Sequence, residues 1–136
     1  MAASRTFSLE VMTPNGPVTS ADVSVVILPA ADGELGILAG HAPVVTLLGA
    51  GVLAFTDAAG KRVRYWAAGG FAHVRDNAVS VLPEVCCPLE KLDPAAAQQE
   101  LDAARALPAA TREAAARRTA AVNTAQAKLR AAVAAR

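Results

Sequence analysis

The chain has 136 residues, enough for one domain with an appendage, and its 54% hydrophobic content excludes a disordered chain. The net charge of +1 is unevenly distributed. Residues 112–136 carry six basic and one acidic side chain, net +5, whereas residues 1–93 carry six basic and nine acidic ones, net −3. We therefore expect an acidic partner for the C-terminal end. The first residues do not resemble a signal peptide, so we do not expect secretion.

The N-terminal part of the chain is typical of short strands. Apolar Phe7, Leu9 and Val11 alternate with polar residues, which is the pattern of a half-buried strand. The PNGP segment at 14–17 predicts a turn. Residues 22–29 are apolar on both faces and predict a strand that is covered on both sides or that crosses between two sheets.

The stretch 32–53 holds five of the nine glycines and almost no charge after Glu34. An apolar run at 35–55 is long enough for a membrane-spanning helix, which is one alternative. The glycines and Pro43 divide this run into short pieces, and the neighbouring segments have strand patterns. We therefore expect three short strands with tight loops, and no insertion into the membrane.

Strand patterns continue to residue 82. On 61–66 the alternation places Arg62, Arg64 and Trp66 on one face, which we interpret as packing at a solvent edge, with an interface role as the alternative. About ten short strands without intervening helices predict an antiparallel β-sandwich or flattened barrel. This domain should span residues 1–88.

The composition changes after Pro88, because alanine, the strongest helix former, provides 19 of the last 43 residues. We expect residues 89–136 to form an antiparallel α-helical hairpin. Its helices should run over about 94–106 and 111–135, separated by Pro108. Because alanine buries little apolar area, the hairpin should be weakly held. The larger apolar residues of the second helix predict one seam, made by Val122, Leu129 and Val133.

No catalytic or metal site is predicted. His41 with Glu34 and Asp32 could form an acid–base pair, but a histidine in a glycine-rich turn is more often structural. The histidines and the cysteine pair lie too far apart in the sequence for a recognisable metal motif. The segment 33–36 lacks the lysine and the spacing of a phosphate-binding loop.

Two further alternatives concern the cysteines and the basic helix. Adjacent Cys86 and Cys87 point apart in extended backbone, so we expect reduced thiols and no disulfide between them. The basic last helix lacks the aromatic residues and the overall charge of a nucleic-acid-binding domain, so no nucleic acid is expected as a partner.

Three motifs together identify a family. GELGILAGHAPVVTLL at 33–48, GGFAHV at 69–74 and AVSVL at 78–82 resemble the epsilon subunit of F-type ATP synthases, which is called delta in mitochondria. The resemblance extends from the first strand to the C-terminal hairpin. Ala39 and Ala50 stand where the family usually has proline, and His73 stands where glutamate is common.

The resemblance implies a ten-stranded sandwich with a two-helix hairpin, mounted on the rotating central stalk of the synthase. It implies a non-catalytic subunit that needs no cofactor, bound peripherally at the cytoplasmic face of the cell inner membrane. The sandwich would bind the gamma subunit, and the end carrying the GELG and GHAP segments would face the c-subunit ring. Glu34 would lie toward the ring and His41 near gamma. The candidate rotor and c-ring interface is Glu34, Gly36, Gly40, His41 and Pro43.

In the family the hairpin can also extend toward the alpha/beta catalytic head and slow ATP hydrolysis. The positive charge of the second helix is compatible with this role, because the resemblance places an acidic loop on the head. The alternative is a solvated basic face. The candidate contacts are Arg112, Arg117, Arg118, Lys128 and Arg130.

ATP is a candidate regulatory ligand, because many bacterial relatives bind it through a Leu-Asp-x-x-Arg-Ala pattern on the hairpin. Leu101, Asp102, Arg105 and Ala106 fit this pattern. An alignment without gaps instead places the Leu-Asp pair at 92–93, where the arginine is missing, and Pro108 then falls in the hairpin turn. We favour this second register, which argues against a nucleotide site.

The competing function is a free-standing β-sandwich module that binds a small ligand or peptide and carries a helical interaction tail. It explains the composition and the architecture but not the GELGI and GHAP motifs. Co-purification of gamma with the tagged protein would discriminate between the two functions.

Overall fold

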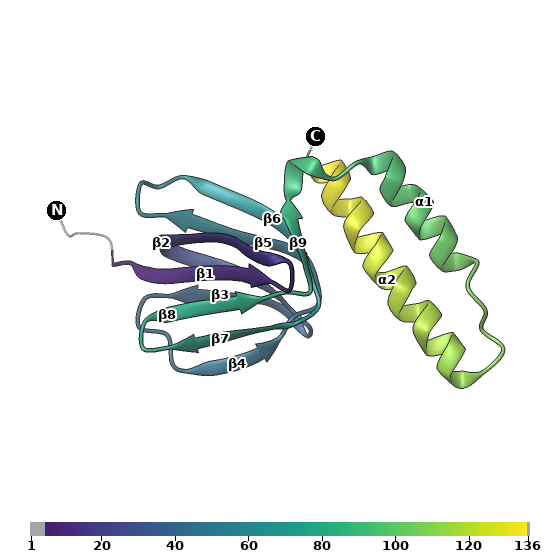
Figure 1. Ribbon diagram of the computed structural model, residues 1–136, viewed down its shortest axis with the longest axis horizontal. Helices are drawn as coiled ribbons and strands as arrows, with labels where there is room; N and C mark the ends of the chain where they lie inside the picture. The colour runs from purple at the N-terminus through teal and green to yellow at the C-terminus, as the bar shows by residue number, and fades with distance from the viewer. Residues whose placement is uncertain (1–4, 136) are drawn as a thin grey trace. The chain divides into compact units, whose positions relative to one another are not determined.

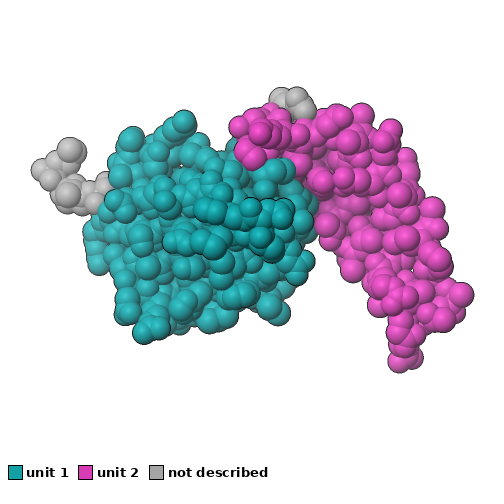
Figure 2. Space-filling view, viewed as in Figure 1, with its two compact units in different colours: residues 1–87 teal, residues 88–136 magenta. Residues whose placement is uncertain are grey.

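The computed structural model describes residues 5–135 and contains nine strands, a 3₁₀ turn and two α-helices (Figure 1). The chain divides into two compact units, Met1–Cys87 and Pro88–Arg136 (Figure 2). The expected β-sandwich followed by a helical hairpin is confirmed. The elements are β1 Phe7–Thr13, β2 Gly16–Ala30, β3 Gly33–Leu38, β4 Val44–Leu47, β5 Ala50–Asp57, β6 Arg62–Ala68, β7 Phe71–Arg75, β8 Ala78–Leu82, β9 Val85–Pro88, η1 Leu89–Lys91, α1 Pro94–Arg105 and α2 Arg112–Ala134.

The first strand follows its sequence pattern. Phe7, Leu9 and Val11 are buried, and the residues between them face outward. On one side β1 pairs antiparallel with β2, and on the other it pairs in parallel with β8. In Figure 1, strands β1, β8, β7 and β4 lie side by side in one layer.

Strand β2 joins the two layers of the sandwich. Its first half pairs with β1, whereas its second half lies between β3 and β5. The register shifts between Val23 and Val25, and a bulge of this kind turns the following side chains to the other face. As a result Val23 and Val26, three residues apart, are both fully buried. The predicted crossing strand is thus confirmed, and because β2 serves both layers the sandwich needs nine strands and not ten.

The sandwich core is a single cluster of side chains from both layers. Alternation on each strand directs one set of side chains between the layers, which is the general basis of a β-sandwich core. The buried residues are Phe7, Leu9, Val11, Val23, Val26, Leu28, Ile37, Leu48, Leu53, Phe55, Ala67, Ala72, Val74, Val79 and Val81.

Residues 35–55, considered above as a membrane span, form parts of β3, β4 and β5. The helical alternative for this run is therefore wrong, because Gly40, Pro43 and Gly49 interrupt it as the sequence indicated. Within the described residues, neither helix combines the length and the apolar character needed to cross a bilayer.

On β6 the interpretation of Trp66 as a solvent-edge residue is wrong. Arg62 and Arg64 are exposed, but Trp66 on the same strand face is only 1% exposed. The alternation correctly predicted the shared face. It carried no information on burial along that face, because Trp66 is buried although it is not part of the sandwich core cluster.

Each helix of the hairpin begins at a side-chain cap. The Asp93 carboxylate accepts a hydrogen bond from the backbone N–H of Ala95, and the Thr111 hydroxyl oxygen accepts one from the N–H of Ala114. Such caps satisfy N–H groups that have no partner inside the helix. Pro108 lies in the loop between the helices, as the gapless register requires.

The hairpin seam differs from the predicted one at its last position. Val122 and Leu129 are partly buried and pack against Leu101, but Val133 is 58% exposed. The neighbouring Ala132 is fully buried instead. Position 133 keeps the four-residue spacing from Leu129, so periodicity alone does not account for its exposure; at this end of the helix Ala131 and Ala132 are the buried residues.

Candidate functional site

The residues expected at the rotor interface lie at two ends of the sandwich. Glu34 follows the β2–β3 turn, Gly36 lies in the middle of β3, and Gly40, His41 and Pro43 lie in the β3–β4 loop. Because an extended strand rises by about 3.3 Å per residue, residues 34–38 alone span about 13 Å. The expectation that the GELG and GHAP segments share one end is therefore wrong.

At the first end, which we call the Glu34 end, backbone hydrogen bonds join the β2–β3, β4–β5 and β6–β7 loops. The Ala31 N–H donates to the Leu47 carbonyl at 2.9 Å, and the Gly49 N–H donates to Pro29 at 2.8 Å. The Leu48 N–H donates to the Gly70 carbonyl at 2.9 Å. The Glu34 side chain is exposed on this tightly bonded frame.

At the opposite end, the β3–β4 loop is closed by a turn. The His41 N–H donates to the Leu38 carbonyl at 3.1 Å, with Gly40 at a φ of 81° in the position that requires glycine in a type II turn. The His41 Nδ1–H donates to the Ala42 carbonyl at 2.7 Å. Since Glu34 lies at the other end of β3, His41 and Glu34 do not form an acid–base pair.

An exposed apolar surface, which the sequence reasoning did not select, lies on the outer side of the β4–β7–β8–β1 layer. Leu47 is 69% exposed, and it lies opposite Phe71, which in turn lies opposite Leu82. Val45 adds to the same side of β4, and Met12 of β1 lines a groove of about 450 Å³ together with Phe71 and Leu82. We call these five residues the apolar face.

The sequence did contain a signal for this face. In β4 the residues Val44, Val45 and Leu47 are apolar on both sides of the strand, although only one side can point into the core. Large apolar residues gathered on an exposed surface are typical of protein–protein contacts.

The basic residues of α2 differ in how they are engaged. Arg112, Arg117 and Arg118 are exposed in the first half of the helix. Arg112 lies in the first turn, where the helix dipole disfavours positive charge. Arg130 is also exposed. Lys128 instead forms an ion pair with Glu100 of α1 at 3.0 Å, so its charge is used within the hairpin.

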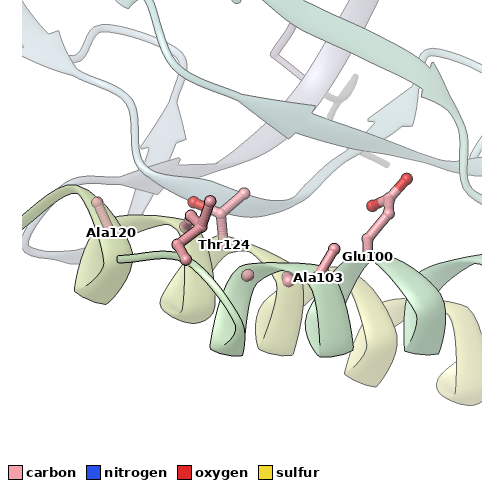
Figure 3. A pocket seen from close by; sticks show the side chains of 8 residues that line it. Glu100, Ala103, Ala120 and Thr124 are labelled. Atoms are coloured by element: carbon pink, nitrogen blue, oxygen red, sulfur yellow. The ribbon is translucent and has the colours of Figure 1, made fainter. Parts of the chain in front are cut away.

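The hairpin helices leave a groove of about 490 Å³ between them, lined mostly by alanine. Figure 3 shows Glu100 and Ala103 of α1 and Ala120 and Thr124 of α2 around it. Small side chains leave this space unfilled, and the lost contacts agree with the expected weak packing of the hairpin.

The residues of the candidate nucleotide pattern are largely engaged in the hairpin itself. Leu101 is buried in the seam, and the Asp102 carboxylate accepts a hydrogen bond from Gln98 at 3.0 Å. Arg105 lies in the last turn of α1 and lines a second groove with Arg118, and Ala106 ends the helix. Helix packing therefore accounts for Leu101 only, because Asp102, Arg105 and Ala106 are exposed.

The Cys86 thiol is free, so the expected absence of a Cys86–Cys87 disulfide is confirmed. Burial, with a smaller contribution from the neighbouring Cys87, raises the pKa of Cys86 to about 11. Cys86 is therefore a protonated, unreactive thiol at neutral pH. Over residues 5–135, the acidic, histidine and cysteine side chains form no group of three that could hold a metal ion.

Comparison with known proteins identifies the family. The sequence model described as "ATP synthase, Delta/Epsilon chain, beta-sandwich domain" matches residues 6–88. The chain belongs to this family. The expectation of a non-catalytic central-stalk subunit of an ATP synthase is thereby confirmed at the level of the family.

Individual relatives cover most of this delta/epsilon chain. It is 46% identical to the ATP synthase epsilon chain of Synechococcus sp. over 99 residues, which are 73% of this chain and 72% of the relative. It is 40% identical to that of Rhodopirellula baltica over 121 residues, 89% of this chain and 94% of the relative. A chain of the Euglena gracilis mitochondrial ATP synthase, solved as an OSCP/F1/c-ring assembly, superposes with a TM-score of 0.82 at 27% identity, covering 98% of this chain and 83% of that one.

Proposed function

We propose that this delta/epsilon chain couples rotation of the c ring to the catalytic head by binding gamma through the apolar face. The observation that carries this proposal is the exposure of Leu47 and Phe71 side by side on two strands. Burying such side chains against a partner removes apolar area from water, which is the main driving force of association. The family to which the chain belongs supplies the partner.

The two ends of the sandwich receive different roles in this proposal. The Glu34 end, together with Gly36, faces the c ring, because its hydrogen-bonded turns provide a firm surface for transmitting torque. The opposite end, with Gly40, His41 and Pro43, makes a second contact with gamma, separated from Leu47 and Phe71 by the length of β4. The chain acts as a peripheral subunit at the cytoplasmic face of the inner membrane.

The hairpin is proposed to reach the alpha/beta head and slow ATP hydrolysis. Exposed Arg112, Arg117 and Arg118 support this, because they present positive charge that an acidic surface of the head would neutralise. Lys128 has another role in the proposal: its ion pair with Glu100 holds the two helices together.

Binding of gamma is tested by Leu47→Glu. A carboxylate buried at the contact should weaken the affinity for purified gamma by about 30-fold or more, the loss typical of a central interface residue. Titration calorimetry of the full chain with gamma measures this. Val85→Glu is the matched control, because Val85 is 52% exposed but lies on β9, at the other edge of the sheet from β4. Equal affinities for the two variants would refute the proposed surface.

Nucleotide binding is a separate question. We expect no saturable heat on titration of the subunit with ATP up to millimolar concentration, because Pro108 occupies the hairpin turn, which fits the register without gaps, and in that register the pattern lacks its arginine. Saturable heat that Arg105→Ala removes would establish the other register and make ATP a regulatory ligand of this chain.

A further inference from the structure

The inference concerns Asn77, whose side chain connects three segments at the end of the sandwich that carries the β3–β4 loop. Its Oδ1 accepts a hydrogen bond from the Gly40 N–H at 2.9 Å, and its Nδ2–H donates to the Thr6 carbonyl at 3.1 Å. Its backbone carbonyl accepts a third bond from the Ser8 N–H at 3.3 Å. One residue thereby joins the β7–β8 turn, the β3–β4 loop and the segment that enters β1.

The backbone around Asn77 is built to present this side chain. Asp76 and Asn77 have φ values of 50° and 61°, as in a two-residue type I′ turn between Arg75 and Ala78. Asparagine is one of the few residues other than glycine that adopt this conformation readily. Glycine would serve the turn equally well, so the turn alone does not account for an amide side chain at this position.

The β3–β4 loop has few other attachments: Ala39 packs against the sandwich core, and the Arg5 guanidinium lies beside Gly40. It is bonded to itself through Leu38 and His41 and through the His41 ring. Over the described part of the chain, the Asn77 amide is the only side chain from another segment that is hydrogen-bonded to residues 39–43. His41 is half-buried and Pro43 is exposed, so the loop presents its side chains at the surface.

We propose that Asn77 is a positioning residue that fixes the β3–β4 loop, through the Gly40 N–H, in the conformation that meets the rotor partner. This inference rests on the proposed function. A loop that is ordered before binding loses less conformational entropy on association, so the Asn77 amide raises affinity without touching the partner.

The test compares three variants of the full chain. Asn77→Gly keeps the positive φ and removes both side-chain bonds. We expect it to weaken gamma binding about tenfold and to speed exchange of the Gly40 amide with solvent about tenfold, measured by NMR. Asn77→Asp keeps an acceptor for the Gly40 N–H but turns a carboxylate oxygen toward the Thr6 carbonyl, so the affinity for gamma and the Gly40 exchange rate should lie between those of the parent and of Asn77→Gly. Asp76→Gly alters the same turn, but the Asp76 side chain has no hydrogen bond to the β3–β4 loop. This variant should change neither the affinity for gamma nor the exchange rate of the Gly40 amide.

Two controls make the outcomes distinct. Gly60→Ala strains a turn remote from the loop and shows what a general loss of stability does to gamma binding. If Leu47→Glu abolishes binding and Asn77→Gly binds normally, the inference is wrong and the proposed function stands. If Leu47→Glu binds normally, the proposed function is wrong, and unchanged Gly40 exchange in Asn77→Gly would independently overturn the positioning role.

Discussion

Replacing Gly70 with alanine is expected to lower the free energy of unfolding by about 2–5 kcal/mol, a large part of the stability of a small domain. Gly70 has a φ of 82°, which costs a residue with a side chain about 1–2 kcal/mol. An added Cβ would also overlap the Leu82 carbonyl oxygen and lie 2.9 Å from the Pro83 Cα. Overpacking against backbone adds about 1–3 kcal/mol. Urea unfolding, monitored by circular dichroism, measures the total loss in the free energy of unfolding.

Gly60→Ala is the matched control for this prediction. Gly60 has a φ of 86°, close to that of Gly70, but its Cβ would meet nothing within 4 Å. Gly60→Ala should therefore lower the free energy of unfolding only by the cost of the positive φ, about 1–2 kcal/mol. If both variants lose the same free energy of unfolding, the turn at Gly70 relaxes. The close approach of the added Cβ to β8 would then be unimportant.

Removing residues 89–136 is expected to raise ATP hydrolysis by the assembled synthase about fivefold or more, the size of a typical regulatory coupling. The deletion leaves the sandwich unit and its apolar face intact, so assembly should be preserved. Steady-state hydrolysis by the purified complex, with the subunit ratio checked by gel, measures the effect. Unchanged hydrolysis would count against an inhibitory hairpin.

A charge-only variant separates the role of the arginines from that of the hairpin as a whole. Arg112, Arg117 and Arg118 changed together to glutamine keep the helix, because all three are exposed and glutamine is a good helix former. If the contact is electrostatic, this variant should reproduce most of the deletion effect, and the inhibition of the parent complex should weaken at high salt. Inhibition that persists in the triple variant would assign it to packing instead.

The sequence predicted the features that depend on local patterns. Alternation on β1 indicated which residues are buried, and Asp93 and Pro108 delimited the first helix. The same reasoning failed where burial depends on distant strands. The period-two pattern places Trp66 and Arg64 on the same face of β6, and it does not indicate that only Trp66 on that face is buried.

The candidate site was predicted only in part, for a related reason. The motifs at 33–48 identified the family, but a motif that is continuous in the sequence was assumed to be continuous in space. The extended backbone of β3 separates Glu34 from His41, and pairing between strands assembles the apolar face from residues as distant as Met12 and Phe71. Asn77 was overlooked because its importance comes from a bond to Gly40, 37 residues away.

The parallel pairing of β1 with β8 has a consequence for how the chain acquires its structure. Leu9 lies opposite Val79, so the layer that carries the apolar face cannot close until almost the whole sandwich has been synthesised. Contacts between residues far apart in sequence slow folding, whereas a helical hairpin forms from local contacts. The regulatory helices can therefore form quickly, but the surface proposed to bind gamma depends on the slowest closure in the chain. A nascent subunit would then become competent to join the rotor only after its first and last long strands have met.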